Sequence, residues 1–159
     1  MDMNAPILDE ATLIETVADA KRRGRTVAFA NGVFDVLHVG HVRYLQAAAR
    51  EADVLVVGVN SDASVQAIKG PGRPLVGQGE RAELVSAIRG VAYVTIFGDA
   101  SPARLIGLLK PDVHCKGTDY TADSVPERDV VRAYGGRVVI VGDPKDHSTT
   151  SILEKMRKQ

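Results

Sequence analysis

Cysteine, long apolar runs and targeting signals are scarce or absent in this sequence, and each shortage excludes a class of protein. The single cysteine, Cys115, excludes an internal disulfide and a cysteine-rich zinc site. No apolar stretch approaches the roughly 20 residues that a membrane-spanning helix needs. Residues 1–6 lack the basic start and apolar run of a signal peptide. We therefore expect a cytoplasmic protein with no membrane partner.

An excess of charge of either sign is also missing. Lys and Arg together number 20, as do Asp and Glu, so the formal net charge is zero. Strong nucleic-acid binding usually requires a basic excess, and we expect no nucleic-acid partner. The remaining composition, 45% apolar and 25% charged over 159 residues, is ordinary for one globular domain with a substantial core.

Two hydrophobic patterns alternate along the chain. Short apolar, β-branched runs predict buried strands at 26–30, 53–59, 91–97, 112–116 and 137–141. Helical spacing predicts helices at 9–23, 39–50, 61–68, 80–89, 102–109 and 149–157. This alternation predicts an α/β fold: one Rossmann-like, doubly wound parallel sheet of five strands with helices on both faces. Ligands bind such sheets at the carboxyl ends of the strands, where the winding direction reverses.

The chain divides into an N-terminal helix within 1–25 and a core over 26–152, which together form a single domain over 1–159. Within the core, the stretch KGPGRPLVGQG at 69–79 contains four glycines and two prolines. It is the one clear loop, and its length suggests a mobile active-site flap.

The most informative stretch, NGVFDVLHVGH, occupies residues 31–41 between the first expected strand and the next helix. Gly32 lets the backbone approach a ligand closely, and the helix beginning near Val39 offers N–H groups and a positive dipole end to an anion. His38 and His41 are three residues apart, so both imidazoles lie on one side of the first turn. Gly40 between them leaves space for phosphate oxygens. Two imidazole donors at an anion site suit phosphoryl-type transfer, in which positioning and charge stabilisation dominate catalysis.

This stretch resembles the signature of the cytidylyltransferase-like superfamily, His-x-Gly-His at a strand-to-helix turn. Within that superfamily the chain resembles most closely the adenylyltransferases that make ADP-heptose from D-glycero-β-D-manno-heptose 1-phosphate and ATP. The similarity runs from about Thr26 to Ile152 and includes NGVFDVLHVGHVRYL, VVGVNSDASVQAIKG, GRPL, GERAELVSAIRGV, PDVHCKGTDY and HSTTSIL. The resemblance implies transfer of AMP to the sugar phosphate, with release of pyrophosphate, in the synthesis of lipopolysaccharide or surface-glycan precursors.

The resemblance also implies roles for individual residues. His38 and His41 would contact the triphosphate and Lys69 would reach the reacting phosphates, which makes these three the catalytic candidates. The nucleotide and its phosphates would further be bound by Asn31, Gly32, Val33, Phe34, Gly40, Arg81, Lys116, Ser148, Thr149 and Thr150. The pocket for base or sugar would be lined by Asp35, Gly117, Asp119 and Tyr120.

Some of these residues also fit plainer roles. Lys69 is compatible with a solvated surface charge, and Arg81 would be unremarkable on any helix. Ser148 and the two threonines after it form a good helix N-cap, a role compatible with phosphate binding. His114 follows no pattern that assigns it to one face of its strand, and His147 suits either the phosphates or an exposed loop.

The implied cofactors are ATP, as a substrate, and Mg²⁺ held mainly by phosphates and water, because no carboxylate cluster is visible in the sequence. Many relatives fuse the heptose enzyme to a sugar kinase, so a separate kinase would supply the sugar phosphate here. Related enzymes are commonly dimers, and we expect a homodimer.

Three alternatives remain open. A nucleic-acid partner is one, because aminoacyl-tRNA synthetases share this type of histidine motif, but the neutral net charge counts against it. A glycerol-3-phosphate or related cytidylyltransferase would use CTP, but that branch ends in Arg-Thr-x-Gly-Ile-Ser-Thr, and residues 145–149 lack its arginine and glycine. The heptose branch commonly reads Lys-Gly-Gly-Asp-Tyr, where this chain has Thr118 in place of the second glycine. A nucleotide-binding protein without catalysis is the alternative of another class, and retention of both histidines and Lys69 argues against it.

Replacing either His38 or His41 by alanine is expected to lower turnover by about a hundredfold or more, because each substitution removes a donor from the charge that builds on the leaving pyrophosphate. Steady-state release of pyrophosphate by folded variants measures this effect. Unchanged turnover in both variants would refute the role of the pair.

Overall fold

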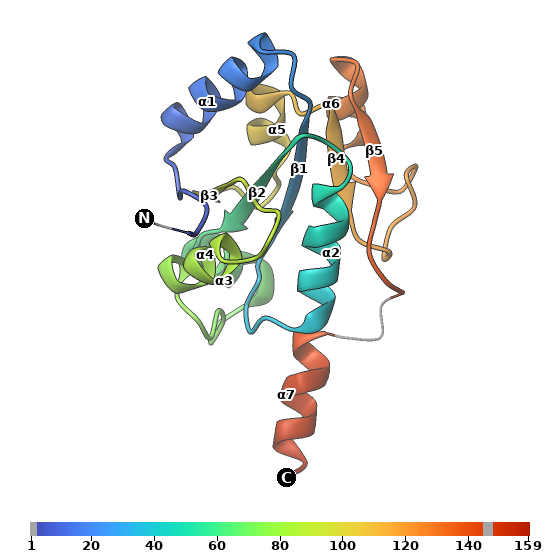
Figure 1. Ribbon diagram of the computed structural model, residues 1–159. Helices are drawn as coiled ribbons and strands as arrows, with labels where there is room; N and C mark the ends of the chain where they lie inside the picture. Colours follow the sequence, from blue (N-terminus) through green and yellow to red (C-terminus); the bar gives the residue numbers. More distant parts are fainter. Residues whose placement is uncertain (1–2, 145–147) are drawn as a thin grey trace.

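A five-stranded, wholly parallel sheet organises the molecule (Figure 1). The computed structural model describes residues 3–144 and 148–159. The strands are β1 Val27–Gly32, β2 Val54–Asn60, β3 Tyr93–Phe97, β4 Val113–Lys116 and β5 Arg137–Ile140. They lie in the order β3-β2-β1-β4-β5, so the winding reverses between β1 and β4. The predicted α/β class and five-stranded sheet are confirmed.

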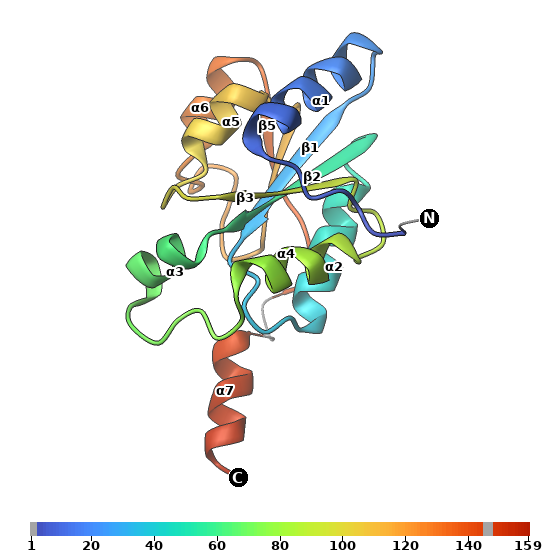
Figure 2. The same cartoon turned by 90° about the vertical axis from the view of Figure 1, so that its left-hand side faces the viewer.

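Helices cover both faces of this sheet (Figure 2). They are α1 Glu10–Arg22, α2 Val39–Ala49, α3 Asp62–Lys69, α4 Gln78–Ser86, α5 Ala103–Leu109, α6 Arg128–Ala133 and α7 Thr149–Arg157. α6 was not predicted, because it has only six residues and buries one of them, Val131. The helix expected at 80–89 ends early, and Ile88 packs against the core from the turn that follows.

The core consists of two layers separated by the sheet. Successive side chains of a strand point to opposite faces, so Ala28 and Ala30 of β1 join one layer while Val27 and Phe29 join the other. The first layer is completed by α2 and α4, and the second by α1, α5 and α6. Every residue of β2 is buried, as expected for a central parallel strand.

The segment before α1 lies along the edge of the sheet, a contact that the sequence pattern did not predict. The amide of Val94 donates to the carbonyl of Pro6 at 3.0 Å, and the amide of Leu8 donates to the carbonyl of Val94 at 2.8 Å. These bonds cover part of the exposed edge of β3. α1 then buries Leu13 and Val17 against the sheet.

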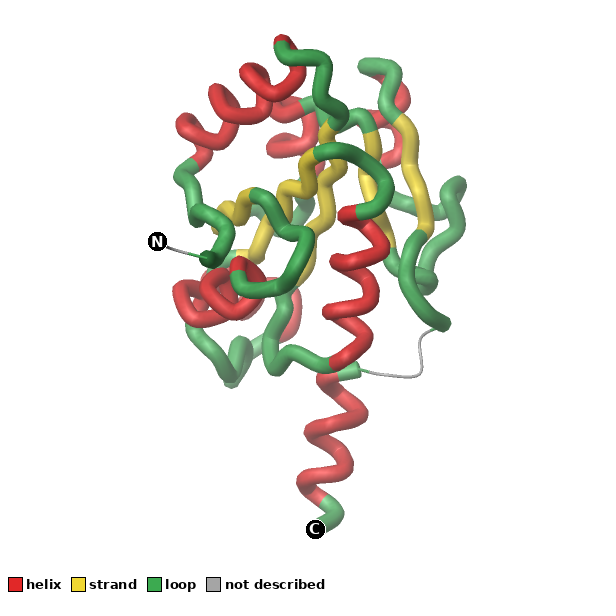
Figure 3. The backbone as a smooth tube through the Cα atoms, viewed as in Figure 1, coloured by secondary structure: helices red, strands yellow, loops and turns green. Residues whose placement is uncertain are grey.

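α7 extends away from the rest of the chain (Figure 3) and has no fully buried residue. Its first turn nevertheless meets the carboxyl edge of the sheet, since the Thr149 hydroxyl donates to the backbone carbonyl of Asp35 at 2.7 Å. Among the described residues, no helix combines the length and apolar character needed to cross a bilayer.

Candidate active site

A cavity of about 460 Å³ opens at the carboxyl edge of the sheet, beside the switch point between β1 and β4. Its walls come from the ends of β1 and β4, from the segment after β5 and from the beginnings of α2 and α7, and Lys69 and Arg73 complete it. All the candidate residues from the sequence line this cavity except Arg81. His147 lies outside the described residues.

The loop between β1 and α2 has an unusual backbone. Phe34 and Val36 have φ values of 53° and 49°, a left-handed conformation that is strained for a β-branched residue. The Thr149 hydroxyl bonds to the carbonyl of Asp35 at 2.7 Å and to that of Val36 at 3.2 Å. α7 thus fixes the strained loop from outside.

Gly32 lies tightly against a side chain of the protein itself. A Cβ built at this position would lie 3.0 Å from Cζ of Phe34, a ring that is buried in the core. The sequence suggested that Gly32 makes room for a ligand. In the structure it makes room for the Phe34 ring, which in turn meets the His41 ring edge-on at a centroid distance of 5.5 Å.

His38 and His41 cap the first turn of α2 reciprocally. His38 is the N-cap, and its Nδ1 accepts from the amide of Gly40 at 3.1 Å. His41 Nδ1 accepts from the amide of His38 at 3.2 Å. This is a capping box in which imidazoles replace the usual hydroxyl and carboxylate. The two rings stack with centroids 3.8 Å apart.

The capping bonds determine which nitrogen of each ring carries the proton. A nitrogen that accepts a hydrogen bond from an amide has no proton of its own, so each neutral imidazole is protonated at Nε2. Both histidines are therefore Nε2–H donors, held beside the positive end of the α2 dipole. This arrangement can bind the oxygens of a polyphosphate.

Asp35 holds the loop between α3 and α4. Its buried carboxylate accepts from the amides of Leu75 and Val76 at 2.9 and 3.0 Å and from Arg73 Nε at 3.0 Å. Burial raises the pKa of Asp35, but these two amides and the guanidinium outweigh burial and bring the pKa below its ordinary value. Asp35 lines the cavity with both carboxylate oxygens already engaged.

Arg81 lies behind the cavity and is completely buried. Its guanidinium donates to the carbonyls of Val33 and Val76 and forms an ion pair with Asp62 at 2.9 Å. It therefore ties the β1–α2 loop to the α3–α4 loop. The sequence placed Arg81 among the phosphate-binding residues, whereas here its side chain supports two walls of the cavity from within the protein.

The cations that line the cavity differ in how their charges are compensated. Arg73 is paired with Asp35, and Lys116 Nζ lies 3.7 Å from Glu127 Oε2. Lys69, in the last turn of α3, is exposed and forms no ion pair with any described residue. Lys69 thus contributes the least compensated positive charge of the three.

The wall after β4 is joined to the segment after β5. The Thr118 hydroxyl donates to the carbonyl of Asp143 at 2.8 Å, and Arg43 from α2 pairs with the Asp143 carboxylate at 2.7 Å. Lys116 Nζ lies 5.2 Å from the centroid of the Tyr120 ring, within range of a cation–π contact.

Sequence reasoning missed several residues that line the cavity: Tyr44, Arg73 and residues 141–144. Two signals were available for them. Arg73 lies in the GRPL stretch that carries part of the family resemblance, and residues 141–144 follow a predicted strand, at the edge where ligands bind. Tyr44 lies in the NGVFDVLHVGHVRYL stretch that also carries the resemblance, but the contact of its hydroxyl with the Cys115 carbonyl arises from the fold alone.

Comparison with known proteins gives consistent matches. The sequence pattern described as cytidylyltransferase-like matches residues 29–155. Two relatives, from Geotalea uraniireducens and Geobacter sulfurreducens, are each named "bifunctional protein HldE" and are 49% and 47% identical to this chain. Both alignments cover 98% of this chain and 32% of the relative. The chain therefore spans about a third of the length of these relatives.

Two solved structures share the fold. The lipopolysaccharide core biosynthesis protein of Thermoplasma volcanium superposes with a TM-score of 0.65 at 26% identity, over 77% of this chain and 100% of that one. The pantothenate synthetase of Thermus thermophilus superposes with a TM-score of 0.60 at 20% identity, over 91% of this chain and 63% of that one. At that identity, the second match shows the fold alone.

The substitution Asp35→Asn should loosen the α3–α4 loop, because an amide group replaces one of the two acceptor oxygens. Loss of a hydrogen bond to a charged group should speed amide hydrogen exchange at Leu75 and Val76 by about tenfold or more. In the wild type the depressed pKa of Asp35 keeps the carboxylate ionised through the ordinary carboxyl range, so protection is lost only as the pH falls through that lowered pKa.

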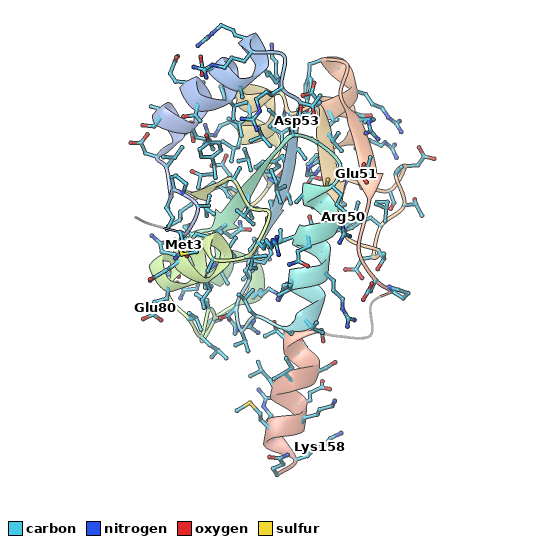
Figure 4. The ribbon with its side chains drawn as sticks, viewed as in Figure 1. Met3, Arg50, Glu51, Asp53, Glu80 and Lys158 are labelled. Atoms are coloured by element: carbon cyan, nitrogen blue, oxygen red, sulfur yellow. The ribbon has the colours of Figure 1, made fainter. Side chains whose placement is uncertain are left out.

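Asp53→Asn is the matched control, since the Asp53 carboxylate accepts from the Thr26 amide at 2.9 Å. Asp53 lies at the opposite end of the sheet from α7 (Figure 4). Its substitution should speed exchange at Thr26 and leave Leu75 and Val76 unchanged. Equal exchange rates at Leu75 and Val76 in the wild type and Asp35→Asn would contradict the anchoring role.

Proposed function

Because the chain belongs to the cytidylyltransferase-like family, we propose that it transfers AMP from ATP to D-glycero-β-D-manno-heptose 1-phosphate, giving ADP-heptose and pyrophosphate. The observation that carries this proposal is the reciprocally capped histidine pair at the head of α2, inside the large cavity at the switch point. The heptose substrate is supported by the sequence resemblance and by similarity to HldE proteins and to a lipopolysaccharide core biosynthesis protein.

In this reaction an oxygen of the sugar phosphate attacks the α-phosphorus of ATP, and the bond to the bridging oxygen of pyrophosphate breaks. The attacking phosphate is already ionised at neutral pH, so no general base and no covalent enzyme intermediate are needed. The protein must instead bring two anions together and stabilise the charge on the leaving group. The cavity wall fits this requirement because it contains basic side chains and the N-termini of two helices.

The triphosphate would lie between the beginnings of two helices. His38 and His41 supply Nε2–H donors at the head of α2, and Ser148, Thr149 and Thr150 lie at the head of α7. Both helix N-termini attract negative charge. Lys69, whose charge is uncompensated by any described carboxylate, would reach the reacting phosphates from the β2 side of the cavity.

The two flanks of the cavity suit different ligands. The β2 flank presents the charge of Lys69, which no described carboxylate compensates, beside an Arg73 that is paired with Asp35, and the charge of Lys69 favours the second phosphate, that of the sugar. The β4 flank presents Asp119, Tyr120 and a lysine already paired with a carboxylate, which suits the uncharged nucleoside. Between the flanks, Oδ1 of Asn31 is buried without a hydrogen-bond partner among the described residues. Such an acceptor is available to a hydroxyl or amino group of the substrate.

Magnesium would enter with the nucleotide as part of the substrate. The described residues hold no group of three or more side chains that could ligate a metal. The carboxylates of Asp35 and Asp143 are engaged by Arg73 and Arg43. Phosphate oxygens and water are the ligands that Mg²⁺ prefers in nucleotide sites.

The sugar 1-phosphate must be supplied by a kinase reaction, whether on a separate protein or on the same polypeptide. The relatives named bifunctional are about three times as long as this chain, which fits a second activity beside this one. A homodimer stays a prediction.

A pyrophosphate-release assay tests the proposed function directly. ATP with the heptose 1-phosphate should give turnover, whereas CTP and glycerol 3-phosphate should give little. No release with any pair of these substrates would overturn nucleotidyl transfer, and release with CTP alone would replace the adenylyl assignment.

The substitution His41→Asn separates capping from chemistry in the same assay. Asparagine keeps an acceptor oxygen near the position of Nδ1 and removes the donor at Nε2, so α2 should stay capped while turnover falls by about a hundredfold or more. The midpoint of thermal unfolding shows whether α2 is still capped, because loss of the cap would lower the stability of the protein. Turnover at the wild-type level in a variant of unchanged stability would exclude His41 from the chemistry.

A further inference from the structure

Glu127 is a charged side chain buried beside the cavity, at the residue before α6. Charged side chains are rarely buried this completely unless they are paired. Glu127 Oε2 lies 3.2 Å from His114 Nε2 and 3.7 Å from Lys116 Nζ. Glu127 therefore links two residues of β4 to the start of α6, at the end of the segment that connects the strand to this helix.

The geometry of β4 explains why one carboxylate reaches both partners. Side chains two residues apart in a strand point to the same face, so His114 and Lys116 face the same layer. His114 is completely buried and stacks on Phe29 at a centroid distance of 5.9 Å. Lys116 lies two residues nearer the carboxyl end of the strand, where its side chain lines the cavity.

The carboxylate of Glu127 is ionised. Burial raises the pKa of Glu127, but the hydrogen bond from His114 and the charge of Lys116 outweigh burial and bring the pKa below its ordinary value. An ionised carboxylate only accepts, so His114 donates from Nε2. Its Nδ1 is buried and has no partner among the described groups. Among the described residues, the hydrogen bond to Glu127 is therefore the one polar contact of the His114 ring.

We propose that Glu127 is a positioning residue for nucleotide binding, which holds the Lys116 ammonium at the cavity wall between its own carboxylate and the Tyr120 ring. This proposal rests on the proposed function. His114 anchors the carboxylate from the core side, and the carboxylate anchors the lysine from the cavity side. The Lys116 side chain is only 13% exposed, so its ammonium has few other places to lie.

A double-mutant cycle tests whether Glu127 acts through Lys116. Glu127→Gln keeps an oxygen that accepts from His114 and removes the charge that holds the lysine. We expect it to raise the KM for ATP, and the Kd of a non-hydrolysable ATP analogue, by about tenfold, the effect of losing one charged contact. The KM for the heptose 1-phosphate and kcat should change by less than about threefold.

Lys116→Met should weaken ATP binding to the same extent, and the double variant should bind no more weakly than Lys116→Met alone. Additive losses in the double variant would overturn the proposal, since Glu127 would then act independently of the lysine. Unchanged KM values with a smaller active fraction in Glu127→Gln would also overturn it, because that pattern reports a purely structural role.

Asp129→Asn is the matched control, because the Asp129 side chain is 88% exposed and lies two residues further along. It should leave every constant unchanged. If Glu127→Gln does not fold, Glu127→Asp replaces it: that variant keeps the charge, and binding of the analogue should be weakened less than in Lys116→Met. A wild-type chain that fails to bind ATP would contradict the proposed function, whereas ATP binding with an additive cycle would contradict the role of Glu127 alone.

Discussion

The reciprocal hydrogen bonding between two imidazoles and the first turn of α2 is the interaction on which the site depends. It occupies Nδ1 of both His38 and His41 with backbone amides and so makes Nε2 the donor of each ring. The Thr149 hydroxyl fixes the strained loop that precedes the two histidines. Asp35 belongs to that loop, and its carboxylate holds the α3–α4 loop. One helix start thus orients two rings, a loop and the head of α7 together.

Charge compensation divides the cavity. Two buried carboxylates, Asp35 and Glu127, each neutralise one basic residue of the wall, Arg73 and Lys116. Lys69 lies on α3 without a carboxylate partner among the described residues. Paired cations stay in place when no substrate is bound, whereas an unpaired cation contributes its full attraction when anions arrive. This division suits a reaction in which two phosphates must approach each other.

The sequence predicted the fold from local patterns, whereas most of the predicted residues of the cavity wall came from the family resemblance. Alternating apolar runs revealed the strands, and the ends of those strands indicated where ligands bind. Arg81 was expected at the phosphates because no local pattern shows that its side chain is buried and reaches the carbonyl of Val33, 48 residues away in sequence, and arginine is rarely buried. Glu127 was missed for a similar reason: it lies 13 residues from His114 in sequence, and only the return of the chain over β4 brings the two together.

Nitrogen-15 NMR of the histidine side chains tests the central claim most directly. Above the ordinary imidazole pKa of about 6.5, we predict that His38 and His41 are both protonated at Nε2 and unprotonated at Nδ1. We further predict that addition of ATP shifts the Nε2 resonances of both rings. A proton on Nδ1 of either ring, or Nε2 resonances that ignore ATP, would contradict the assignment of these two imidazoles as phosphate donors.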